Sequence, residues 1–117
     1  MVTTDNLPIY KDSYDFLLSL FLVTKELKKE YKYTVGESLK KETIALVLDI
    51  YRANSSIEKR VIHLQSAREK IETIRLLLRL LRDLRQITLE KFVALNTKIE
   101  IISRQLTGWL KKRQASQ

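Results

Sequence analysis

The stretch REKIETIRLLLRLLRDLRQI, residues 68–87, decides the fold of this chain. As an α-helix it places four arginines on one narrow stripe, because steps of seven, four and three residues return to nearly the same face. These are Arg68, Arg75, Arg79 and Arg82. The apolar residues cover far more than the stripe of roughly 100° that one core contact requires. We therefore expect this helix to be covered on more than one side, by its own bundle and by a second copy or a partner protein. Because burying an unpaired charge is costly, the stripe must face water, acidic groups or phosphate.

Composition limits the classes of protein to which this chain can belong. Its 117 residues suffice for one domain with a real core, and the lack of cysteine excludes disulfides and thiolate metal sites. With His63 as the single histidine, we expect no catalytic pair, no metal site and no other cofactor, and hence no enzyme. The formal net charge of +8 favours an anionic partner, although a basic surface can also serve solubility alone.

No segment of the sequence suggests insertion into a membrane or export. The apolar run at residues 16–23 is interrupted by Ser19 and is far shorter than the roughly 20 residues of a spanning helix. Residues 1–8 lack the pattern of a signal peptide. We therefore expect a cytoplasmic protein that has no membrane partner.

Hydrophobic periodicity predicts four helices separated by short breaks. The expected helices lie at about residues 9–31, 35–53, 56–86 and 89–112, followed by a frayed tail at 113–117. Helices of this length with short connections favour an all-α fold, an antiparallel up-and-down four-helix bundle that forms a single domain over residues 1–117.

The helix starts are marked by polar side chains. Capping-box spacing, in which Ser or Thr precedes Glu by three positions, occurs at Thr34 and at Ser55 and predicts the second and third helices. Thr88 is the expected cap of the fourth helix. That helix carries an apolar seam ending at Trp109, which we expect to pack in the core, while Gly108 predicts a close approach between helices.

The arginines are clustered, whereas the lysines are spread over the chain. Seven of the nine arginines lie between Arg52 and Arg85. Because arginine makes planar, bidentate contacts with phosphate and carboxylate, the clustering hints at recognition. The alternative is a solvated face with local ion pairs, such as Arg79 with Asp83, and residue types alone favour neither interpretation.

Three segments carry a resemblance to a known family: LPIYKDSYDFLL at 7–18, RLLLRLLRDLRQI at 75–87 and IEIISRQLTGWLKK at 99–112. Together they resemble the accessory variability (Avd-like) four-helix-bundle proteins of diversity-generating retroelements. Their wider relatives are small four-helix proteins encoded in intervening sequences of ribosomal RNA genes. In the last segment the family usually has smaller or more apolar residues, and here only Gly108 and Trp109 keep its pattern.

The resemblance implies a non-catalytic protein that forms homopentamers, binds nucleic acid with little sequence preference and associates with a reverse transcriptase. Such proteins assist the copying of template RNA into mutagenised cDNA. Arg75, Arg79 and Asp83 match the family's motif in the third helix, and Arg82 and Arg85 extend its charge here. The basic residues of this region are therefore candidates for contact with phosphate or a partner. The candidates are Arg68, Arg75, Arg79, Arg82 and Arg85, with Lys111, Lys112 and Arg113 as secondary ones. The alternative function is an oligomeric protein-interaction scaffold with no nucleic-acid role.

Overall fold

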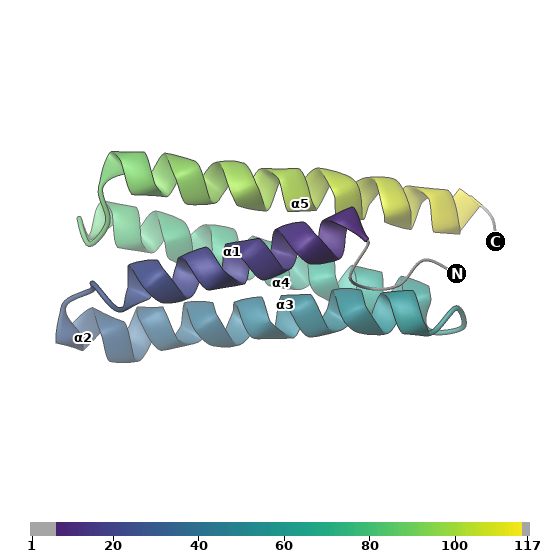
Figure 1. Cartoon of the computed structure of the whole chain (residues 1–117), viewed down its shortest axis with the longest axis horizontal. Helices are drawn as coiled ribbons and strands as arrows, with labels where there is room; N and C mark the ends of the chain where they lie inside the picture. The colour runs from purple at the N-terminus through teal and green to yellow at the C-terminus, as the bar shows by residue number, and fades with distance from the viewer. Residues whose placement is uncertain (1–6, 116–117) are drawn as a thin grey trace.

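The computed structural model describes residues 7–115, and their side chains as far as residue 113. Four long helices form the bundle: α1 (Pro8–Thr24), α3 (Glu37–Ser55), α4 (Arg60–Asp83) and α5 (Leu89–Ala115). A short α2 (Lys29–Tyr31) and a π-helical turn, η2 (Lys32–Gly36), lead directly into α3. The long helices lie side by side in a body of 46 × 20 × 20 Å (Figure 1). The predicted all-α four-helix bundle is confirmed.

Contacts at both ends of α1 show how it lies against α3. The ring of Tyr10, near the start of α1, lies 6.5 Å from the ring of Tyr51, near the end of α3. Toward the other end, the Nζ of Lys40 lies 5.1 Å from the ring centroid of Phe21. The two helices therefore run in opposite directions, and the ribbon in Figure 1 reverses again from α3 to α4 and from α4 to α5.

The core is built from apolar residues spaced three and four positions apart. On α4 the buried apolar residues are Leu64, Ala67, Ile71, Ile74, Leu78 and Leu81. On α5 they are Leu95, Ile99, Ile102, Leu106 and Leu110, and Phe92 and Trp109 pack against the edge of the core. The predicted seam and the packing role of Trp109 are confirmed. Each fully buried Leu or Ile contributes about 1.5–3 kcal/mol to folding, so this periodic face is the main source of stability.

The first helix ends earlier than predicted, and a short helical segment precedes the second long helix. α1 ends at Thr24 rather than near residue 31, and Lys28 has an extended ψ of 146° that interrupts the helical hydrogen bonds. The chain is then helical from Lys29 through η2 into α3, so no helix starts at Thr34. The hydroxyl of Thr34 instead donates to the carbonyl oxygen of Glu30 at 2.7 Å. The prediction of a capping box at this threonine is wrong.

The close approach expected at Gly108 occurs at Gly36 instead. A Cβ on Gly36 would lie 3.3 Å from the Cδ1 of Leu27 and 3.3 Å from the carbonyl oxygen of Tyr31. A Cβ on Gly108 would meet no described atom within 4 Å. The prediction for Gly108 is therefore wrong within the described chain, and η2 is the place where a missing side chain allows tight packing.

The third long helix, α4, is shorter than the expected 56–86. The capping box predicted at Ser55 is wrong, because α4 begins at Arg60 with Lys59 at the N-cap position and no side-chain hydrogen bond caps it. In the turn before the helix, the hydroxyl oxygen of Ser56 accepts from the backbone N–H of Lys59 at 3.2 Å. Ser55 is the last residue of α3. With 24 residues α4 is about 36 Å long. Its more polar first half packs in the bundle, since Leu64 and Ala67 are fully buried.

The last helix, α5, begins as predicted and ends later. The Oγ1 of Thr88 accepts from the backbone N–H of Lys91 at 3.1 Å, which confirms the expected cap. The helix continues to Ala115, so the frayed tail predicted from residue 113 is wrong as far as residue 115. Residues 116–117 lie outside the part of the chain that the structure describes.

Candidate nucleic-acid interface

Four arginines share one stripe of α4, from which Arg75 and Arg82 contact α5, and we call them the α4 row. They are Arg68, Arg75, Arg79 and Arg82. From the first to the last, 14 residues at 1.5 Å each give a length of about 21 Å. The sequence predicted this common face, and the structure brings the four together as expected.

Arg75 is the member of the row that holds two helices together. Its Nε and Nη2 donate to the two carboxylate oxygens of Glu100 on α5, at 2.7 and 3.0 Å. Nη2 also donates to the hydroxyl of Ser103 at 3.0 Å, and Nη1 pairs with Glu72. The hydrogen bond that Arg75 donates to Glu100 raises the pKa of Arg75, and the same bond lowers the pKa of the Glu100 carboxyl. Arg75 is therefore engaged by protein carboxylates and is the candidate least available to a phosphate.

Arg79 and Arg82 are more open than Arg75. The side chain of Arg79 is 70% exposed, and its Nε lies 3.9 Å from Asp83, the long i,i+4 pair that the sequence suggested. Arg82 lies over the ring of Phe92, with 4.8 Å from the guanidinium carbon to the ring centroid, and donates to Asp83 at 3.0 and 3.1 Å. The aromatic ring fixes the direction of Arg82 while its side chain stays 39% exposed.

A family model described as bAvd-like matches residues 7–113, from the start of α1 to the last turns of α5. The chain belongs to the bAvd-like family. The match confirms the resemblance that the three sequence segments carry, and it covers every residue of the α4 row. It also makes the chain a member of a family of non-catalytic accessory proteins. No protein with curated annotation matches the chain.

At the end of α4, the bAvd-like chain holds Arg85 in an unusual backbone conformation. Its φ is +57°, in the left-handed region that glycine usually occupies at this position of a helix end. The backbone N–H of Gln86 donates to Leu81 and that of Arg85 to Arg82, both at 2.9 Å, which is the Schellman pattern. The Arg85 side chain is exposed and makes no hydrogen bond or ion pair with the described residues.

The remaining candidates of this bAvd-like protein lie toward the other end of α4. Arg68 and Lys111 are exposed, and neither side chain makes a hydrogen bond or ion pair with residues 7–113. Lys112 and Arg113 line a cavity together with Arg60, a residue that the sequence analysis did not select. The eight predicted residues therefore form two groups, the α4 row with its exposed neighbours and a separate cluster at the end of α5.

The sequence analysis did not select three exposed lysines in the segment between α1 and η2 as candidates. Lys25 and Lys28 are exposed in the turn between α1 and α2, and Lys29 is exposed at the start of α2. The backbone N–H of Lys28 donates to the Oε1 of Gln86 at 3.4 Å, which joins this turn to the one after α4. The lysine-rich run KELKKEYK at residues 25–32 was the available signal. A continuous helix was expected there, so the turn that contains part of this run was not predicted.

Among the residues that the structure describes, no three His, Asp or Glu side chains come together in a group that could hold a metal ion. Within residues 7–115, no helix has both the length and the apolar character needed to cross a membrane.

Proposed function

We propose that this bAvd-like protein is a non-catalytic accessory factor of a retroelement. It binds template RNA or cDNA through the α4 row and associates with a reverse transcriptase in the cytoplasm to support mutagenic cDNA synthesis. The observation that carries the proposal is the exposure of Arg68, Arg79 and Arg82 along one helix of a family of accessory proteins. The retroelement, the polymerase and the template come from the family resemblance.

The length of the α4 row suits a nucleic-acid backbone. Successive phosphates of one duplex strand advance by about 3.4 Å, so a row of about 21 Å faces about six of them. The carboxylates of Glu72, Glu100 and Asp83 offset part of the charge, and they act mainly on Arg75 and Arg82. Arg68 and Arg79 thus supply the largest unneutralised charge, and we expect them to dominate binding.

The test is fluorescence anisotropy of a labelled structured RNA, titrated with protein at several salt concentrations. The double variant Arg68→Ala/Arg79→Ala should reduce the slope of log K against log salt by about 0.7–0.9 per lost phosphate contact. The control is Arg52→Ala/Arg104→Ala, which removes the same charge from exposed positions on α3 and α5. Equal slopes for the two variants would mean that the α4 row is not the binding surface.

A second surface supports assembly. Six large apolar or aromatic side chains are exposed on adjoining faces of α1 and α3: Tyr14, Leu18, Phe21, Ile44, Leu48 and Tyr51. Leu76 and Leu80 on α4 and Leu84 just after its end are also exposed, in agreement with the apolar excess seen in the sequence. Apolar patches of this kind mark protein contacts. We propose that the face on α1 and α3 contacts a second copy, and that the homo-oligomer is a pentamer as in the resembling family.

Native mass spectrometry of Leu18→Glu and Leu48→Glu tests this contact. Both side chains are more than two-fifths exposed, so each variant should keep its helical circular dichroism and lose the oligomer. Ile57→Glu is the control, because Ile57 is exposed in the turn between α3 and α4. If both variants keep the oligomeric mass of the wild type, the face on α1 and α3 is not the interface.

The alternative function, a protein-interaction scaffold with no nucleic-acid role, is favoured by the same exposed apolar faces. A chain that forms oligomers and captures the reverse transcriptase, but shows no RNA binding even at low salt, would establish that alternative. A chain that binds RNA but not the polymerase would remove the polymerase from the proposal.

A further inference from the structure

A cavity of about 510 Å³ lies where the end of α3, the start of α4 and the last turns of α5 meet. Its wall includes Ser55, Ile57, Arg60, Trp109, Lys112 and Arg113. This volume lies within the range of about 300–1,000 Å³ typical of small-ligand sites. The cavity is separate from the α4 row, because none of the arginines in that row lines it.

The cavity concentrates positive charge. Of the described residues that line it, three are cations and none is a carboxylate. Burial and the nearby charge of Arg113 lower the pKa of Arg60, so the two guanidinium groups repel each other. The Nε of Arg113 is buried and has no hydrogen-bond partner among the described atoms. An arrangement of this kind is stabilised by an anion that lies between the two groups.

Arg60 is held in place by backbone carbonyls. Its Nε donates to the carbonyl oxygen of Ala53 at 2.6 Å, and its Nη2 donates to that of Asn54 at 3.1 Å. These bonds cap the end of α3 and fix the guanidinium against the cavity. Because Arg60 is tied to α3, Arg113 and Lys112 are the cations that can be changed without removing this cap.

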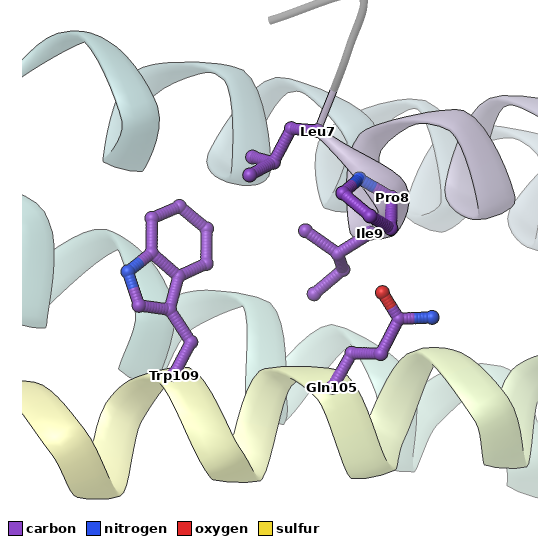
Figure 2. A pocket seen from close by; sticks show the side chains of 5 residues that line it. All are labelled: Leu7, Pro8, Ile9, Gln105 and Trp109. Atoms are coloured by element: carbon purple, nitrogen blue, oxygen red, sulfur yellow. The ribbon is translucent and has the colours of Figure 1, made fainter. Parts of the chain in front are cut away.

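Trp109 gives the cavity an aromatic wall. The guanidinium carbon of Arg60 lies 5.7 Å from the centroid of its ring. Figure 2 shows that the indole also faces Leu7 and Ile9, in an adjoining cavity of about 200 Å³. The ring is therefore supported by α1, and a flat ligand in the larger cavity would meet an aromatic surface beside cations. The hydroxyl of Ser55 donates to Tyr51 at 3.0 Å, so its oxygen can still accept a hydrogen bond from a base edge.

We propose that this cavity binds one nucleoside 5′-phosphate unit, with the base against Trp109 and the phosphate between Arg60, Lys112 and Arg113. The ligand chemistry combines a planar base, which stacks on aromatic rings, with a phosphate, which arginine binds in a bidentate manner. The unit can come from a free nucleotide or from the 5′-phosphorylated end of a strand. The cavity requires no contribution from the α4 row, so this proposal and the proposed function are tested independently.

Trp109 is the single tryptophan of the chain, so its own fluorescence reports on the cavity. We expect adenosine monophosphate to quench it with saturation, and adenosine to bind about tenfold more weakly, because it lacks the charge-assisted hydrogen bonds. Inorganic phosphate should compete without quenching. A short oligonucleotide with a 5′-phosphate, compared with the same strand bearing a 5′-hydroxyl, separates a strand end from a free nucleotide as the source.

Two variants locate the binding. Arg113→Gln should lower the affinity for adenosine monophosphate by about tenfold. Arg104→Gln, which removes the same charge from an exposed position on α5, should leave the affinity unchanged. If Arg113→Gln lowers the helical signal, Lys112→Gln replaces it with the same expectation. Equal affinities for the cavity variant and the control would overturn the proposal, as would the absence of saturable quenching. Tighter binding of phosphotyrosine than of adenosine monophosphate would assign the cavity to a phosphopeptide instead.

Discussion

The contact between Arg75 and Glu100 makes a quantitative prediction about the stability of the bundle. Arg75 donates two hydrogen bonds to the carboxylate and a third to Ser103, at 2.7, 3.0 and 3.0 Å. Hydrogen bonds to charged groups contribute about 1.5–3 kcal/mol when shielded, whereas exposed ion pairs contribute about 0.2–1 kcal/mol. The two side chains are 29% and 43% exposed, so an intermediate value applies. We expect a coupling free energy of about 1–1.5 kcal/mol between Arg75 and Glu100.

A double-mutant cycle measures this coupling. The four proteins are wild type, Arg75→Ala, Glu100→Ala and the double variant, each unfolded by urea and followed by circular dichroism at one fixed protomer concentration. The fixed concentration matters because assembly of copies stabilises the folded state by mass action. The coupling is the amount by which the double variant is more stable than the sum of the two single losses predicts.

A coupling close to zero would refute the reasoning, because it would mean that the bidentate contact does not persist in solution. Arg79→Ala serves as the matched control, since the side chain of Arg79 is 70% exposed and its single ion pair measures 3.9 Å. We expect this control to change the free energy of unfolding by less than about 0.5 kcal/mol. A larger loss would show that Arg79 has a structural role.

Three further predictions concern single positions. Because its bond with Arg75 lowers the pKa of Glu100, the contribution of the pair is fully present above the unfolded pKa of about 4.5 and disappears as the pH falls below it. The stability difference between wild type and Glu100→Gln should therefore shrink in urea titrations at acidic pH. Gly108→Ala should raise the free energy of unfolding by about 0.5–1 kcal/mol, measured as a higher urea midpoint at constant slope. A decrease would mean that Gly108 contacts another molecule. Arg85→Gly should raise stability by about 1 kcal/mol, because glycine adopts the left-handed conformation without strain, and should weaken RNA binding in the anisotropy assay. Lower stability would contradict the left-handed backbone at this position.

The parts of the fold that follow from local periodicity were predictable. The buried face of α5 repeats at steps of three and four residues, and the hydroxyl of Thr88 lies beside the helix start that it caps. The break after Thr24 was not predictable in the same way, because residues 25–28 contain neither glycine nor proline. The box at Thr34 has the right spacing but lies inside a helical segment, where its hydroxyl bonds backward to Glu30.

The candidate site was also only partly predictable from local sequence. The sequence placed four arginines on one face of α4, and that geometry is present. The sequence could not show that Arg75 is paired while Arg79 is exposed. The partners of Arg75 on α5 are Glu100 and Ser103, which lie 25 and 28 positions away in the chain. The cavity beside Trp109 was equally hidden, since three helices contribute to its wall. Side-chain roles that depend on distant segments require the packed bundle.

The π-helical turn η2 has a consequence for how chains of this family are aligned. A π turn closes its hydrogen bond one residue later than an α turn, so it holds one extra residue within a helical segment. Loss of one residue there can convert the turn to ordinary α-helix and leave the inward side of α3 in place. The same loss in the middle of α3 would rotate every later side chain by about 100° and take Ile50 out of the core. A bAvd-like sequence that is one residue shorter at Lys32–Gly36 can therefore keep the same bundle. Differences in length need not fall in the loops, because this position lies inside a helical segment.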